Sequence, residues 1–363
     1  MRQLRKVIFR TLCVALMLAA GLVAVNTSAQ AAVPNRWGFA YVDVPNGVPN
    51  LTHQAGSWPA AFNVSVATPL GGPTLVRFPQ IATNGGVVHV TAVSDGPHWC
   101  QALWWGPSGP DQFVAVRCYR YGGGPVTIPF TVVFEQSSGV LPAPQGFGYV
   151  HYSGVTIATQ FNSAGGPPNT VVPGPPGVWT VTLPGLGSTG RTGGVQVTAL
   201  NPTQPARCKV GGWASAPGAQ VVQVRCHNAL NVPLNTGWTL TYQRERAITG
   251  AAVPPKNFAY TFDNNPANPG PYSPLPVAVN HNSQGGLNTV QTAGAGFRLI
   301  TFPAVGVLPD HVQVTAYGPG PEYCNLLTLW GTGGLNATVR DVVCYNAVAR
   351  VNQRSLTSYT SAR

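Results

Sequence analysis

Alternation of apolar and polar residues with a period of two dominates residues 33–363 and predicts short β-strands. The pattern V-x-V-T-A occurs three times, at residues 88–92, 195–199 and 312–316. Further runs rich in β-branched and aromatic residues lie at residues 113–116, 130–134 and 221–224. Gly, Pro, Asn and Ser bound these runs, and no segment beyond Ala31 has a convincing helical period. The pattern therefore predicts an all-β protein.

Landmarks that recur in constant order divide the chain into three related segments. Each segment has an F-x-Y motif, then Phe-Pro or Leu-Pro, then V-x-V-T-A, then the first cysteine of a pair. The F-x-Y motifs lie at residues 39–41, 147–149 and 258–260. Pro/Gly/Ala-rich linkers at 137–144 and 247–255 separate the segments. We expect three tandem antiparallel β-sandwich domains of immunoglobulin-like type at residues 32–140, 141–252 and 253–363, with about seven strands each.

Paired cysteines predict a staple in every segment. All cysteines except Cys13 lie beyond Ala31, and they form three pairs of similar spacing: Cys100 with Cys118, Cys208 with Cys226, and Cys324 with Cys344. The midpoint of each pair falls in a turn-like sequence, so each pair can bridge opposing residues of one β-hairpin. Such a staple contributes about 3 kcal/mol in the chain-entropy account. No C-x-x-C motif and no second Cys/His pair lies near, so we expect no metal site.

The stretch from Met1 to Ala31 has the features of a secretory signal peptide. Four basic residues lie within the first ten positions, an uncharged apolar run spans residues 11–25, and an A-x-A site allows cleavage after Ala31. The alternative, a retained membrane anchor, is disfavoured because this run is shorter than the roughly 20 residues that a spanning helix needs. The expected location is extracellular, with no membrane span.

Composition limits the classes of partner. The chain has 20 Lys and Arg against 9 Asp and Glu, and only 8% of its residues are charged. Its basic residues are scattered, whereas nucleic-acid binding requires a clustered patch, so we expect no nucleic-acid partner. A hydrophobic content of 44% gives the chain enough apolar surface to fold.

Tryptophans supply the candidate binding residues. Trp105, Trp213 and Trp330 occupy one shared position before the second cysteine and are expected in the core. Four others are tryptophans peculiar to the first segment: Trp37, Trp58, Trp99 and Trp104. Neighbouring strand residues point to opposite faces, so Trp104 faces out if Trp105 faces in. Exposed tryptophans suit stacking on a sugar ring or a peptide. The alternative is that these rings pack against another segment or a loop.

Candidate catalytic residues are not apparent in the sequence. The nine acids are spread singly and none occupies the same landmark in all three segments, so no carboxylate pair of a glycosidase can be named. No G-x-S-x-G, H-E-x-x-H or P-loop motif occurs. His89 replaces Gln196 and Gln313 in V-x-V-T-A and is interpreted as an outward-facing strand residue. We expect no catalytic residue and no cofactor, although a triad of distant residues stays open.

With Asn-Ser-x-Gly-Gly at residues 162–166 and 282–286, the order of motifs resembles secreted repeat proteins of actinobacterial type that have no assigned function. The resemblance implies a fold and an exported location, and no catalytic residue. The first segment departs from it. Asn63 lies closer along the chain to Phe78 than Asn162 does to Leu183, and it is not followed by Ser-x-Gly-Gly. This altered loop and the extra tryptophans single out the first segment for ligand binding.

Three functional hypotheses follow. The favoured one is a secreted non-catalytic binding or surface protein that recognises carbohydrate or cell-wall polymer through aromatic residues of the first segment. The second is an extracellular hydrolase, which requires a cleft that gathers scattered His and acidic residues. The third is an inhibitor that binds an extracellular protein through a disulfide-braced hairpin tip such as residues 106–110.

Overall fold

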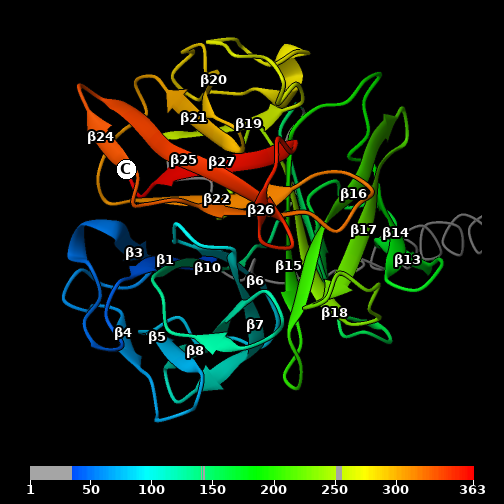
Figure 1. Cartoon of the computed structure of the whole chain (residues 1–363). Coiled ribbons are helices and arrows are strands. Elements are labelled where there is room, and N and C mark those ends of the chain that lie inside the picture. Colours follow the sequence, from blue (N-terminus) through cyan, green and yellow to red (C-terminus); the bar gives the residue numbers. More distant parts are fainter. Residues whose placement is uncertain (1–34, 140, 142–143, 251–255) are drawn as a thin grey trace, which may run out of the picture. The chain divides into compact units, whose positions relative to one another are not determined.

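The computed structural model describes residues 35–139, 141, 144–250 and 256–363, and the predicted signal peptide at residues 1–31 lies outside them. The described residues form antiparallel sheets with no α-helix, and the only helical turns are η1 (Leu51–His53) and η2 (Val277–Val279). This confirms the all-β prediction (Figure 1). Residues from Pro34 to Arg363 belong to one compact unit. The division into three domains therefore stays a prediction, and residues 32–140, 141–252 and 253–363 are called the first, second and third segments.

Strands of the first segment form two sheets with the orders β3-β1-β10-β6 and β7-β8-β5-β4-β2, and β9 pairs with β8. Their bounds are β1 (Arg36–Val42), β2 (Asn46–Gly47), β3 (Gln54–Gly56), β4 (Ser65–Ala67), β5 (Thr74–Phe78), β6 (Val87–Ala92), β7 (His98–Ser108), β8 (Asp111–Arg120), β9 (Pro125–Val126) and β10 (Phe130–Gln136). Val90 and Val132 from one sheet share a core with Val76 and Val114 from the other. The two sheets therefore pack face to face as a sandwich.

The second segment repeats this arrangement with the orders β12-β11-β18-β15 and β13-β14-β17-β16, and β15 continues into β7, so that the first two segments share one ten-stranded sheet. Its strands are β11 (Gly146–Tyr152), β12 (Ile157–Asn162), β13 (Thr170–Pro173), β14 (Val178–Pro184), β15 (Gly194–Leu200), β16 (Ala206–Ala216), β17 (Ala219–Asn228) and β18 (Gly237–Arg244). Val197 and Leu240 meet Val181 and Val222 in its core.

The third segment has the orders β19-β27-β22 and β20-β21-β25-β23, and β24 and β26 pair with β25. Its strands are β19 (Phe258–Asp263), β20 (Thr289–Gly294), β21 (Phe297–Phe302), β22 (Asp310–Ala316), β23 (Tyr323–Leu326), β24 (Gly331–Gly333), β25 (Asn336–Asn346), β26 (Ala349–Arg350) and β27 (Ser355–Ser361). Val312 and Tyr359 share a core with Ile300 and Val339.

The three predicted disulfides are present, each between residues directly opposite each other on two paired strands. Cys100–Cys118 joins β7 to β8, Cys208–Cys226 joins β16 to β17, and Cys324–Cys344 joins β23 to β25. Each staple therefore lies within one sheet, whereas the disulfide of antibody domains crosses between the two sheets.

Register corrects the alignment of the first segment. Phe39 in β1 pairs with Val133, which in turn pairs with His89. In the other segments, the residue that is linked in the same way to Gln196 or Gln313 is Tyr149 or Tyr260. Trp37 thus corresponds to the phenylalanine of the F-x-Y motifs at 147–149 and 258–260. The alignment that made Trp37 peculiar to the first segment was wrong.

A serine contact supports the same correction. The Ser163 hydroxyl accepts a hydrogen bond from the Phe147 amide at 2.8 Å, and Ser283 accepts one from Phe258 at 2.9 Å. In the first segment the acceptor is Ser57, at 3.0 Å from the Trp37 amide. Gly56-Ser57 is therefore the counterpart of the Asn-Ser pairs, and the prediction of Asn63 at this position was wrong. The Asn-Ser motif could not be recognised in the first segment because glycine replaces its asparagine.

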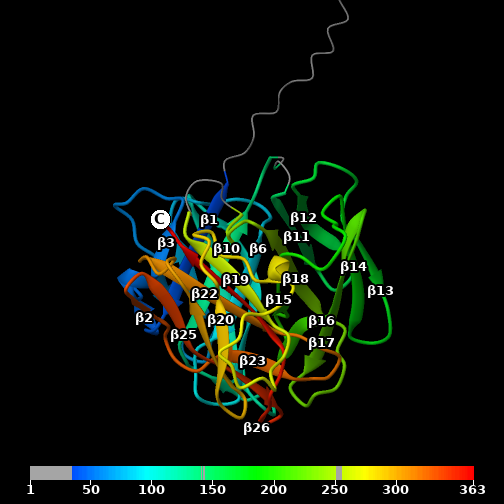
Figure 2. The same ribbon diagram turned by 90° about the horizontal axis from the view of Figure 1, so that it is seen from above.

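Central strands β6, β15 and β22 contact one another and join the three segments (Figure 2). The residue after each V-x-V-T-A motif makes a parallel bridge to the strand that begins near the first cysteine of another segment. The three bridges are Leu200 with Ala102, Val93 with Leu326, and Tyr317 with Val210. They connect the second segment to the first, the first to the third, and the third to the second, and so close a ring.

Polar residues of the V-x-V-T-A strands fill the junction between segments. His89, which is 1% exposed, contacts Thr198 Oγ1 at 3.2 Å and Thr241 Oγ1 at 2.8 Å. His89 does point away from the core of its own segment, as interpreted from the sequence, but the second segment covers it. Burial lowers the pKa of His89 to about 3, so its ring is neutral at pH 7.

Candidate functional site

Two of the four candidate tryptophans are buried, so the expectation that they offer exposed rings was wrong. Trp37 is 5% exposed and packs with Phe39 and with Ile248 of the second segment. Trp99 is also 5% exposed; its ring stacks on Tyr119 and meets Tyr323 edge-on. Both rings face away from the core of the first segment and are covered by other segments. This is the packing alternative that the sequence left open.

Trp58 is half-buried and fills a gap left by glycine. A Cβ atom at Gly56 would lie 1.8 Å from the Trp58 ring, and one at Gly38 would lie 2.4 Å from it. The ring also packs near Phe78, with 6.0 Å between ring centroids. In the second segment the corresponding space holds Asn162, whose amide nitrogen donates to the Pro184 carbonyl at 2.8 Å. Trp58 therefore has a packing role, which is possible because the glycine of the Gly-Ser sequence leaves space for its ring.

Trp104 is the one candidate that is exposed, with 45% of its surface accessible. The ladder between β7 and β8 shifts between Ala102 and Trp104, which places Trp104 opposite Ala115 and Trp105 opposite Val114. Strand β16 has the same shift between Val210 and Gly212. Because the bulges match, Gly212 is the counterpart of Trp104. The fold therefore does not require a large side chain here.

Two open hollows flank the Trp104 ring. One, of about 350 Å³, lies between the first and second segments and includes Trp105, His151 and Leu200 in its lining. The other, of about 270 Å³, runs along the β7–β8 hairpin and is lined by Trp104, Gly106, Pro107, Ser108 and Phe113. The predicted hairpin tip therefore adjoins the Trp104 site, and both aromatic and small polar groups surround the ring.

No Asp, Glu, Lys or Arg is among the described residues that line these two hollows. Their one titratable group is His151, and burial lowers its pKa to about 4. The imidazole is therefore neutral at pH 7. The Ser108 hydroxyl supplies hydrogen-bonding capacity, and the Thr159 hydroxyl, which donates to the Gly86 carbonyl at 3.1 Å, can still accept. An uncharged surface with aromatic rings and hydroxyl groups suits a neutral polar ligand.

Trp105 forms one wall of the larger hollow. Its Nε1 donates to the Gly85 carbonyl at 2.9 Å, and its ring centroid lies 4.4 Å from that of His151. These contacts fix the ring, which is half-buried. Trp213 and Trp330, at the shared position, are fully packed in their cores. The prediction that Trp105 is a core residue holds only in part, because its outer side borders the hollow.

His151 and Phe113 were not predicted as site residues. Phe113 begins a run of alternating residues, and its outward direction follows from the period of two. His151 lies on β11 of the second segment, so no local signal in the sequence connects it with Trp105. The contact arises only where the two segments meet.

The described residues include a buried histidine–carboxylate pair. His53 Nδ1 lies 2.6 Å from Asp310 Oδ1, and Asp310 also accepts hydrogen bonds from Trp330 Nε1 at 2.9 Å and the Tyr359 hydroxyl at 2.9 Å. Neither His53 nor Asp310 lines a hollow beside Trp104. This pair therefore does not form the cleft that the hydrolase hypothesis requires. No group of three His, Cys, Asp or Glu in the described ranges is placed to hold a metal ion.

Comparison with family models, curated proteins and solved structures gives no match. Across its described ranges the chain contains no helix long and apolar enough to cross a membrane.

Proposed function

We propose that this protein is exported and acts as a non-catalytic carbohydrate-binding protein, with Trp104 as the residue on which a sugar ring stacks. The single observation that carries the proposal is the exposed Trp104 ring between two uncharged hollows. A sugar ring has an apolar face and a hydroxyl rim. It therefore matches an aromatic face surrounded by hydroxyls and neutral imidazole better than a charged ligand does.

The position of Trp104 supports a role beyond packing. Its ring has no hydrogen bond and no ring contact with the described residues, and its counterparts are Gly212 and Leu329. A side chain that stability does not require, held exposed on a stapled hairpin, is typical of a recognition residue. The rigid strand pair fixes its direction, so little conformational entropy is lost on binding.

Export is supported by two independent features. The leader expected at residues 1–31 has the order of charge, apolar run and cleavage site of a secretory signal. The three disulfides are typical of proteins that fold in oxidising compartments. In this location the accessible carbohydrates include the glycan strands of cell walls and insoluble polysaccharides.

Retention of the full mature chain on insoluble chitin, cellulose and purified cell walls tests the proposal. Trp104→Leu introduces the residue of the third segment and should weaken retention by about tenfold, while Trp104→Tyr keeps an aromatic face and should retain most of it. Leu70→Ala is the matched control, since Leu70 is a fully exposed apolar residue of the same segment. If the parent does not bind any of the three materials, or if Trp104→Leu binds like the parent, the proposal is wrong.

A further inference from the structure

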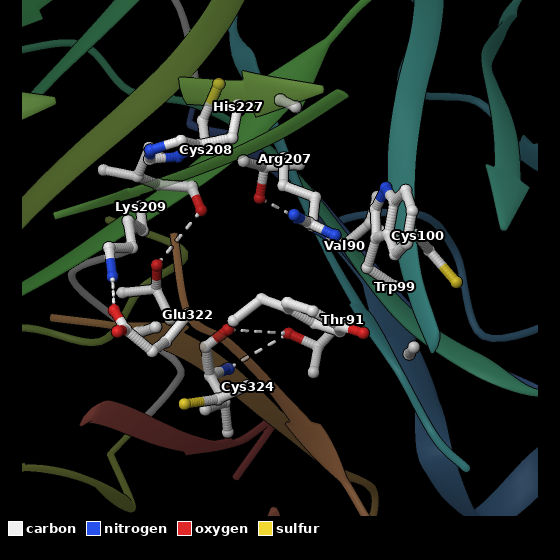
Figure 3. Close-up of a pocket in the computed structure, with 18 of the residues that line it drawn as sticks. Val90, Thr91, Trp99, Cys100, Arg207, Cys208, Lys209, His227, Glu322 and Cys324 are labelled. Atoms are coloured by element: carbon white, nitrogen blue, oxygen red, sulfur yellow. Dashed lines mark hydrogen bonds and ion pairs between the residues drawn. The ribbon is translucent and has the colours of Figure 1, made fainter. Parts of the chain in front are cut away.

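A further cavity, of about 50 Å³, lies where the three segments meet. All three V-x-V-T-A strands line it, together with residues beside the first cysteine of each segment (Figure 3). One water molecule requires roughly 10 to 15 Å³ of such space, so the cavity can hold a group of a few non-hydrogen atoms. It is separate from the hollows beside Trp104, since no residue lines both.

Arg207 dominates the chemistry of this cavity. The residues that precede the first cysteines are Trp99, Arg207 and Tyr323, and the guanidinium carbon lies 4.6 Å from the Trp99 ring centroid and 4.4 Å from that of Tyr323. Both aromatic faces stabilise the cation. The two rings meet edge to face, with 70° between their planes, so they contact the guanidinium from neighbouring directions. A ring face attracts the cation but offers its N–H groups no oxygen or nitrogen acceptor.

Two nitrogen atoms of Arg207 lack an acceptor in the described structure. The side chain is only 5% exposed, and Nη2 donates to Asn231 Oδ1. Nε and Nη1 are buried and make no hydrogen bond with the described residues. A buried donor of a charged group without an acceptor is costly, because it has lost its hydration. The geometry therefore calls for an acceptor beside these two nitrogens.

The remaining charges leave the cavity positive. Lys209 Nζ pairs with Glu322 Oε2 at 2.9 Å, as Figure 3 shows, so these two charges compensate each other. Burial lowers the pKa of His227 to about 4, and its ring is neutral at pH 7. Burial also lowers the pKa of Arg207, to about 10, which keeps the guanidinium protonated. One positive charge is thus left without a counter-charge among the described lining residues.

We propose that this cavity is a binding site for one small oxyanion, which accepts a hydrogen bond from an unpartnered nitrogen, Nε or Nη1, of Arg207. Sulfate, phosphate and a carboxylate share this chemistry, since each presents anionic oxygens that accept charge-assisted hydrogen bonds from a guanidinium. Such a ligand would contact all three segments at their junction. Binding would therefore stabilise the contacts between segments as well as the anion itself.

Calorimetric titration of the full mature chain with sodium sulfate, sodium phosphate and sodium acetate tests this site, with sodium chloride at matched ionic strength as the comparison. We expect saturable binding of one oxyanion per chain and a rise in melting temperature beyond that in chloride. The relative affinities of the three salts distinguish a tetrahedral oxyanion from a carboxylate. If no oxyanion binds saturably, or if all four salts shift the melting temperature equally, the site does not exist.

Variants locate the binding. Arg207→Met keeps an apolar side chain beside the two rings and removes the donors, so affinity should fall by at least about tenfold. Arg225→Gln removes the same charge from a half-buried residue of the same segment that does not line the cavity, and affinity should stay within about twofold. An equal loss in both variants would show that net charge alone attracts the anion and would overturn the assignment. Should Arg207→Met fail to fold, Arg207→Lys retains the charge without the fork and gives the same contrast.

Discussion

Thr91 of the first segment and Val314 of the third are joined by a hydrogen bond, which the Thr91 hydroxyl accepts from the Val314 amide at 3.0 Å. The same hydroxyl donates its one hydrogen to Gln313 Oε1 at 2.6 Å, with the Val314 carbonyl farther away at 3.2 Å. Thr198 of the second segment accepts from the Val90 amide at 3.2 Å, and Thr315 of the third donates to the Val197 carbonyl at 3.3 Å. The threonine of each V-x-V-T-A motif therefore holds the backbone of a neighbouring segment, which gives a physical reason for the motif.

Removal of a junction hydroxyl should destabilise the whole chain. Thr91→Val keeps the shape of the side chain but leaves the buried Val314 amide without its acceptor, so the free energy of unfolding should fall by about 1 to 3 kcal/mol. Thr156→Val, at an exposed threonine, is the control and should change it by less than about 0.5 kcal/mol. Urea unfolding followed by fluorescence measures both. An effect of Thr91→Val no greater than that of the control would contradict the role of the junction.

A buried carboxyl should make stability fall as pH rises above 4.5. Burial raises the pKa of Glu135 well above its usual 4.5, against a smaller opposite effect of the hydrogen bond from Ser137, and its Oε1 lacks a partner among the described residues. Above pH 4.5 the unfolded chain releases a proton that the folded chain keeps, so stability decreases as pH rises toward the folded-state pKa. Glu135→Gln introduces glutamine, which the second segment has at the corresponding position, Gln243.

The Gln variant should melt at a higher temperature than the parent at pH 8. The difference should narrow as pH falls toward 4, with a slope of at most about 1.4 kcal/mol per pH unit for one proton. Calorimetric melts across this range measure it. A difference that does not depend on pH would show that Glu135 is not the group responsible.

His89 should produce an opposite dependence at acid pH. Its pKa is about 3 in the folded state, against 6.5 for the free side chain, so between these values the unfolded chain binds a proton that the folded chain does not. Stability contributed by neutral His89 is therefore lost as pH falls below 6.5. His89→Gln introduces the residue that the other two segments have at this position. It should weaken the dependence of the free energy of unfolding on pH below 6.5, even if it lowers that free energy at pH 7. An unchanged acid slope would argue against this assignment.

Substitution of the shared tryptophans should separate a core position from a border position. Trp213→Ala removes a fully packed ring and should cost about 3 to 5 kcal/mol. Trp105→Ala removes a half-buried ring and should cost less, about 1 to 2 kcal/mol, because less apolar surface is lost. Thermal melts of the two variants give the comparison. Equal losses would show that Trp105 is as essential to packing as its counterpart.

Several features of this protein follow from the sequence by itself. The period of two predicts the strands, because side-chain direction along a strand is a local property, and with Trp105 facing in it also predicts the outward direction of Trp104. The equal spacing of Cys100–Cys118 and Cys208–Cys226 about a turn predicts the hairpin staples for the same local reason.

Only the tertiary structure decides what covers the outward face. Trp99 and Trp104 both point away from the core of the first segment, yet Trp99 is buried between segments and Trp104 is exposed. Contacts such as those of Arg207 with Trp99 and of Trp105 with His151 join residues far apart in sequence. The local pattern reports the direction of a side chain from its own strand, whereas its burial depends on which distant surface packs against that strand, and a single sequence holds no local signal for that packing.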